Sequence, residues 1–292
     1  MLALGVNPFM LMVLAQVFEA GHGVLPQNRS KLLAAFADTL LERERKRWQG
    51  DGWPGADAIR QALAELAYAM QATGERGTAV TPTWAMEHLA EVGCVAKDVL
   101  YLGRSATLLD ASGDNVRFFH QLIQEYFAAL EWQTRFAVDE ELLRYWPDGW
   151  LEPTGWEETA ILLTGMLPDI STFVSAMASV NPVLAARCVA ESGADPRDDV
   201  IASVQAALIA VATSCTEPVP ARHAAGDALN ILGDLRPGVD CRRTACRTSC
   251  GAMCRQVISS WVNIKATDSM AYDDEAPQHR PNLDSIRSAS IQ

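Results

Sequence analysis

Positive charge is scarce in this sequence. Its 292 residues include 24 Lys and Arg against 36 Asp and Glu, so the formal net charge is −12 at pH 7. A protein that coats nucleic acid needs a concentrated basic surface to neutralise phosphates, and the overall composition excludes that class. Apolar residues make up 49% of the chain and charged residues 21%, a balance typical of globular proteins. The length predicts about two domains.

Long uninterrupted apolar segments are also lacking. The most apolar stretch is the opening, Met1 to Phe18, which is interrupted by Asn7-Pro8 and has no Lys or Arg before Arg29. A secretory signal needs a positively charged start, and a membrane-spanning helix needs about 20 apolar residues. We therefore expect neither of these, and we expect a cytoplasmic protein with no membrane partner.

A phosphate-binding loop is missing from the whole sequence. No segment fits the pattern GxxxxGK[ST], in which a Gly-rich turn with Lys and Ser or Thr opens a helix and cradles phosphates. No hydrophobic strand ends in the paired acids that would hold magnesium. We therefore predict no catalytic residues and no bound cofactor in this chain, and no turnover of nucleoside triphosphates.

Cysteine is sparse except in one short segment. Four of the seven cysteines crowd together, at Cys241, Cys246, Cys250 and Cys254. Their spacing, C-x4-C-x3-C-x3-C, lacks the C-x2-C pairs typical of zinc sites. The last three would lie along one helix face, stretched too far to meet a single tetrahedral ion. We predict no metal site here and no disulfide framework.

Residues 9–20 and 28–47 have the apolar spacing of two helices. Pro8 suits the first turn of the first helix, because its missing N–H costs little there. The second helix ends in the mixed-charge turn 42–47, whose cations suit a helix C-terminus. The turn-rich segment 49–55 that follows is typical of a linker.

A compact unit is expected over residues 57–135. The apolar spacing predicts three helices, over residues 59–70, from Thr81-Pro82 onward and over residues 94–102. The segments 106–109 and 116–119 flank a Gly- and Asn-rich turn and predict a β-hairpin. Three helices and a hairpin make a winged-helix arrangement, which an amphipathic helix from Gln121 to Phe136 then extends.

Residues 136–237 have a pattern of helical pairs with short breaks. The five apolar segments lie at residues 156–167, 170–180, 182–191, 199–215 and 220–232. Periodically broken helices are typical of a short α-solenoid of the HEAT type. The expected fold class is mainly α: a winged-helix unit with a small β-hairpin, HEAT-like repeats and an irregular tail. Trp146, Trp150 and Trp156 would form either a recognition patch or, more often at such spacings, core anchors.

The segment FFHQLIQEYFAA, residues 118–129, resembles the winged-helix signature of NACHT-type STAND nucleotide triphosphatases. About 110 residues earlier, NPFML (7–11) and GVLPQNR (23–29) resemble the helical stretch just after the nucleotide-binding core of these proteins. The segment 150–158 and the helical pairs resemble the sensor region of bacterial members. The resemblance implies that residues 1–56 follow a NACHT nucleotide-binding core that this sequence does not contain.

The resemblance also gives two residues a contact with nucleotide in an intact relative. Pro8 matches the family proline that packs on the adenine ring. His120 matches the winged-helix histidine that reaches the β-phosphate of bound ADP and holds the closed, inactive state. The simpler alternatives are that Pro8 only starts a helix and that His120 is a packed polar residue beside the hairpin. ATP or ADP is then a cofactor of the full-length relative.

The tail, residues 238–292, is expected to be disordered or out of its original reading frame. Its segment DSMAYDDEAPQH, residues 268–279, resembles the start of the formylglycine-generating, sulfatase-modifying fold, which bacterial NACHT proteins can carry after their helical repeats. Plausible GC-rich codons for residues 240–263, read two nucleotides later, give LPADGLPDIVWCDVPAGDFIMGE, the segment that should precede it. The module is cut short at Gln292, so we expect no enzymatic activity from it.

These observations favour one function and leave two alternatives. We expect a fragment of a NACHT signalling NTPase that supplies a regulatory winged helix and a helical recognition surface, with no catalysis of its own. Its partners would be other proteins, a second copy through the helical repeats, and the missing nucleotide-binding domain. The alternatives are an independent helical adaptor for protein partners and a DNA-binding winged-helix regulator, whose candidate recognition helix carries only Lys97 and Arg104 as cations.

Overall fold

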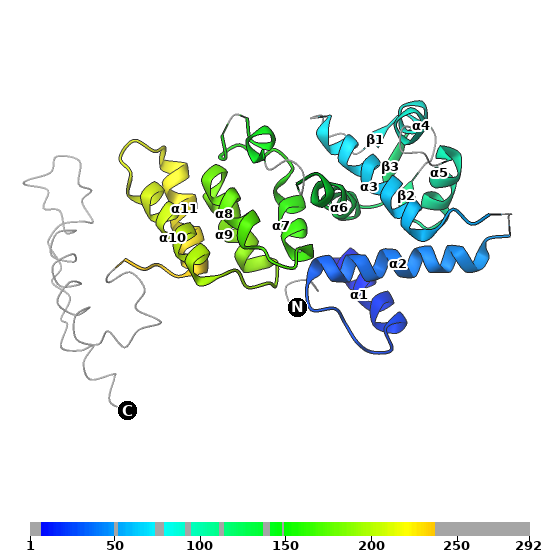
Figure 1. Ribbon diagram of the computed structural model, residues 1–292, viewed down its shortest axis with the longest axis horizontal. Coiled ribbons are helices and arrows are strands. Elements are labelled where there is room, and N and C mark those ends of the chain that lie inside the picture. The colour runs from blue at the N-terminus through cyan, green and yellow to red at the C-terminus, as the bar shows by residue number, and fades with distance from the viewer. Residues whose placement is uncertain are drawn as a thin grey trace, which may run out of the picture. The chain divides into compact units, whose positions relative to one another are not determined.

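The computed structural model of the chain describes residues 7–49, 52–73, 79–90, 95–110, 114–136, 141–147 and 149–236. These residues form eleven α-helices, one 3-10 helix and three short strands (Figure 1). The fold is therefore mainly α with a small β-hairpin, as the sequence predicts. The chain divides into two compact units, residues 1–233 and 234–292, and the elements described below belong to the first.

Two capped helices open the described chain. α1 (Pro8–Ala20) begins after Asn7, whose side chain accepts the N–H of Phe9 at 2.9 Å. α2 (Arg29–Arg47) begins after Asn28, whose side chain caps it in the same way. An asparagine at this position satisfies one of the free N–H groups at a helix start. Both helices predicted from the apolar spacing are confirmed.

α1 is apolar on two faces but packs with only one of them. Its residues Met10, Val13 and Val17 are buried, and the helix contacts α2. On the other side, Leu11 and Phe18 each leave 51% of their surface exposed. Because a helix that is apolar all round is normally covered, the outer face of α1 is a surface that another domain or molecule can cover.

The winged-helix unit has three helices and a three-stranded antiparallel sheet. In chain order the elements are α3 (Ala56–Ala72), β1 (Ala79–Val80), α4 (Pro82–Ala90), α5 (Ala96–Ser105), β2 (Leu109–Asp110) and β3 (Val116–Phe118). The sheet order is β1-β3-β2, with Ala79 opposite Arg117 and Leu109 opposite Phe118. The predicted hairpin is confirmed as β2 and β3. β1 is a third strand that the sequence did not indicate.

α6 (Gln121–Phe136) connects the winged-helix unit to the helices that follow. It packs along α3 on one side and against α7 (Glu157–Met166) on the other. Its buried side chains include Phe127 and Trp132, both without exposed surface. One helix thus belongs to the cores of both parts of the chain.

The remaining helices stack in a layered array (Figure 1). After the 3-10 helix η2 (Leu142–Tyr145) and α7, the elements are α8 (Ser171–Val180), α9 (Pro182–Glu191), α10 (Asp198–Thr213) and α11 (Val219–Leu232). α9 contacts α7, α8, α10 and α11, and α10 also contacts α11. Each of these helices therefore packs against one that is near it in sequence. The array is HEAT-like, and the predicted breaks between its helices are confirmed.

Buried aromatic rings fill the seam between α6 and the array. Trp132 has no exposed surface, Trp146 has 2% and Trp156 has 6%. The ring centroid of Trp132 lies 5.2 Å from that of Trp156 and 6.4 Å from that of Trp146. The interpretation of Trp146 and Trp156 as a recognition patch is therefore wrong, because their rings anchor the core. Trp150 is half-buried.

Among the helices described, none has both the length and the apolar character that crossing a bilayer requires.

Candidate functional site

The starts of four helices meet around one pocket. It has a volume of about 310 Å³ and is lined by Asn7 and Met10 of α1, Arg29 of α2, His120, Gln121, Leu122 and Glu125 at the start of α6, and Glu158 of α7. All of these except Glu125 lie in the cap or first turn of a helix. A helix N-terminus carries partial positive charge and favours an anion, whereas the carboxylates of Glu125 and Glu158 in the same lining oppose one.

His120 lines this pocket with a fixed orientation. Its Nδ1 accepts the backbone N–H of Leu122 at 3.1 Å, and its ring stacks on Phe9 with the centroids 3.9 Å apart. An imidazole whose Nδ1 accepts carries its proton on Nε2, so Nε2–H is the donor left for a ligand. Burial lowers the pKa of His120, which favours the neutral ring.

The structure brings together the two segments that the sequence resemblance singles out. Pro8 is exposed at the first position of α1, between the lining residue Asn7 and Phe9, whose ring covers His120. Pro8 therefore does start a helix, as the simpler alternative has it. It does so beside the pocket that His120 lines, although more than 100 residues separate them in sequence.

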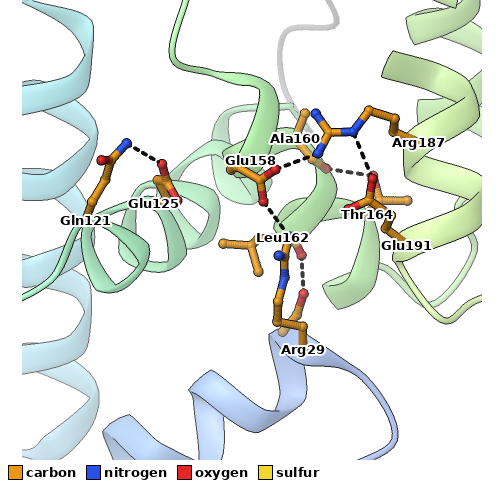
Figure 2. A network of polar contacts seen from close by, with 10 residues as sticks. Arg29, Gln121, Glu125, Glu158, Ala160, Leu162, Thr164, Arg187 and Glu191 are labelled. Carbon is orange, nitrogen blue, oxygen red and sulfur yellow. Dashed lines mark hydrogen bonds and ion pairs between the residues drawn. The ribbon is translucent and has the colours of Figure 1, made fainter. Parts of the chain in front are cut away.

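A chain of ion pairs runs from the pocket residues Arg29 and Glu158 to Arg187 in the helical array (Figure 2). Glu158 accepts from Arg29 at 2.5 Å and from Arg187 of α9 at 2.6 Å, and Arg187 also binds Glu191 at 2.8 Å. Burial alone would raise the pKa of Glu158, but the two guanidinium groups outweigh it and hold the pKa below its ordinary value. Glu158 thus stays ionised and fixes Arg29 at the pocket.

Glu125 is a buried acid in the pocket lining, with 6% of its surface exposed. It accepts a hydrogen bond from Gln121 Nε2 at 2.8 Å (Figure 2). Burial raises its pKa to about 7. The hydrogen bond from Gln121 opposes this shift, while the nearby charge of Glu158 adds to it. Near neutral pH, the Glu125 carboxyl therefore exists in both protonation states.

α2 docks closely on α7 next to the pocket. Ser30 Oγ donates to the Leu162 carbonyl at 2.7 Å, and Asn28 Nδ2 donates to the Gly165 carbonyl at 3.0 Å. A side chain at Gly165 would meet Ser30, with a Cβ 3.1 Å from the serine Cβ and closer still to Oγ. These hydrogen bonds therefore fix the position of the start of α2 along α7, and with it the position of Arg29.

α5 is the helix that a DNA-binding winged helix would place in the major groove. Lys97 and Arg104 are its exposed cations among the described residues, with Asp98 in its first turn and Tyr101 64% exposed. On the neighbouring hairpin, Arg117 pairs with Asp110 at 2.7 Å. This face offers little net positive charge to a duplex, so it does not favour the DNA-binding alternative.

No model of a known protein family matches the chain, and no curated protein does either. Within the described residues, no three His, Cys, Asp or Glu side chains gather where they could hold a metal ion. The cysteines at 241–254 and the segment 268–279 lie outside the described residues. The interpretation of this pocket as a candidate binding site therefore rests on its geometry and on the sequence segments that line it.

Proposed function

We propose that this chain supplies the winged-helix and helical recognition parts of a NACHT-type STAND signalling ATPase, without catalysis of its own. The observation that carries the proposal is that Asn7 and His120 line one pocket, while Pro8 lies between Asn7 and Phe9, whose ring stacks on His120. The family resemblance assigns these two segments to opposite ends of a bound nucleotide, and the fold puts them side by side. Such a protein would act in the cytoplasm.

The pocket has the chemistry for the phosphate end of a nucleotide. His120 offers Nε2–H, and the first turns of α1 and α6 add their positive ends. These groups can orient a phosphate oxygen, but they do not replace the glycine-rich loop and magnesium ligands that grip a triphosphate. The main grip on the nucleotide would therefore come from the separate nucleotide-binding domain, which would pack on the exposed face of α1.

The helical array would provide the recognition surface. Its last described helix, α11, exposes two large apolar side chains, Val219 at 73% and Ile231 at 58%. Exposed apolar residues on the end of a stacked array favour a protein partner or a second copy there. The same observation supports the adaptor alternative, in which the array binds partners and the pocket has no role.

The proposal predicts weak contact of the chain with ADP and no ATP turnover. In an NMR titration of the 15N-labelled chain, ADP should shift the His120 imidazole and the Leu122 amide, with a dissociation constant on the order of 1 mM. His120→Ala should remove these shifts. His88→Ala is the matched control, because His88 also stacks on an aromatic ring, Trp84, but lies on α4. ATP hydrolysis that His120→Ala abolishes would overturn the proposal, as would ADP shifts that survive His120→Ala.

A further inference from the structure

Glu125 puts a second carboxyl group, besides that of Glu158, into a pocket where the surrounding helix starts favour negative ligands. It lies one helical turn below His120 and Gln121 on α6, with 94% of its surface covered. The groups that face it are His120 and Gln121 on α6, Arg29 on α2, and Glu157 and Glu158 on α7. The guanidinium of Arg29 is already bound to Glu158 at 2.5 Å. Among the described residues, no nearby cation is therefore paired with Glu125 alone.

The two protonation states of Glu125 have opposite effects on an anion in the pocket. An ionised carboxylate can only accept hydrogen bonds and adds a second negative charge beside Glu158. A protonated carboxyl has an O–H that can donate to an oxyanion, together with Nε2–H of His120. Glu125 already accepts from Gln121 through Oε1, so the protonated form keeps its existing hydrogen bond.

We infer that Glu125 is the specificity-determining residue of the pocket: its protonated carboxyl donates to a phosphoryl oxygen, and its carboxylate excludes the anion. Binding of the anion then takes up one proton. The inference rests on the proposed function, since it names the residue that regulates the phosphate end of the same site. The pKa of Glu125, raised to about 7 by burial, puts the change in the neutral range. Burial lowers the pKa of His120, which opposes protonation of its ring in the same range.

Sulfate is the probe that isolates the protein's contribution, because its charge stays at −2 between pH 6 and 8 whereas the charge of ADP does not. Sulfate binding to the full chain, followed by NMR shifts of His120 and Leu122, should weaken about tenfold between pH 6 and pH 8. That factor is expected for one group with a pKa near 7 that must be protonated in the complex.

Two variants separate Glu125 from its neighbours. Glu125→Gln is neutral and keeps a donor, so it should bind sulfate at pH 8 about as tightly as the unaltered chain does at pH 6, with no pH dependence. His120→Ala should bind sulfate more weakly at both pH values and keep the tenfold ratio. Near-UV circular dichroism confirms that each variant retains its packing.

The inference is overturned if Glu125→Gln keeps the tenfold ratio, if the unaltered chain binds sulfate equally well at both pH values, or if it does not bind sulfate at all. Its failure is distinguishable from failure of the proposed function. ADP shifts that require His120, without any pH effect on sulfate, would leave only the proposed function standing. A pH effect that Glu125→Gln removes, with no ADP contact at His120, would leave only the anion selectivity of Glu125.

Discussion

Glu125→Gln should raise the melting temperature of the protein at pH 8 by about 5–10 °C. The carboxyl is 94% covered, and its folded-state pKa of about 7 lies above the ordinary value of 4.5. Keeping this group ionised in the fold at pH 8 therefore costs on the order of 3 kcal/mol. Glutamine has nearly the same shape, can still accept from Gln121 and carries no charge to bury.

The pH dependence of this effect has a definite sign. Because burial raises the pKa of Glu125, the folded state holds the proton more tightly than the unfolded state. Below pH 4.5 the Glu125 carboxyl is protonated in both states and its stabilising contribution is fully present. This contribution is lost as the pH rises through 7, and at higher pH the free energy of unfolding changes no further because of Glu125. The advantage of Glu125→Gln should shrink in parallel as the pH is lowered from 7 to 4.5.

Thermal unfolding at pH 8, 6 and 4.5 measures this prediction directly. Glu87→Gln is the matched control, since Glu87 is a glutamate of α4 whose side chain is exposed. The control should change the melting temperature by about 1–2 °C at most, because surface substitutions seldom exceed 0.5 kcal/mol. A Glu125→Gln protein that is less stable than the unaltered chain at pH 8 would contradict the argument.

Gly165→Ala should lower the melting temperature by about 4–8 °C, which corresponds to roughly 2 kcal/mol. The new methyl group would meet Ser30, whose Oγ is buried and donates to the Leu162 carbonyl. Moving Ser30 breaks that hydrogen bond, and keeping it in place forces α2 away from α7. Either result costs more than the helix propensity that alanine gains over glycine, about 0.5–1 kcal/mol.

Gly226→Ala is the control for Gly165→Ala, because both glycines lie within helices of the array. A Cβ at Gly226 meets nothing within 4 Å, so this variant should be as stable as the unaltered chain or slightly more stable. In the same melting experiment, Gly165→Ala should therefore lower the melting temperature, whereas Gly226→Ala should leave it unchanged or raise it slightly. Equal stabilisation by both would mean that α2 is not held against α7 as described.

Helix positions were readable from sequence where local chemistry sets them. Asn28 begins α2, and Asn181-Pro182 ends α8 and begins α9, because an asparagine cap and a first-turn proline act within a few residues. β1 was not readable, since Ala79–Val80 is too short to show alternation and is defined only by its pairing with β3. Strand pairing over such a distance in sequence leaves no local signal.

Only part of the candidate site could be predicted. His120 and Pro8 came from the family resemblance, whereas Arg29, Glu125 and Glu158 reach the pocket from three helices whose packing no local pattern specifies. Glu125 carried one usable signal: it is an acid that shares its helix face with Ala128, Ala129 and Trp132, which are buried in α6. An acid on an apolar helix face is a candidate for a shifted pKa and for a site.

The three tryptophans packed at the seam give the protein a built-in optical label. Indole rings held rigidly at centroid separations of 5.2 and 6.4 Å in an asymmetric core produce strong near-ultraviolet circular dichroism, which disappears when packing loosens even if helices persist. Trp132 is on α6, whereas Trp146 directly follows η2 and Trp156 directly precedes α7. Separation of the array from the winged-helix unit should therefore weaken the near-ultraviolet circular dichroism, a signal that needs no attached dye.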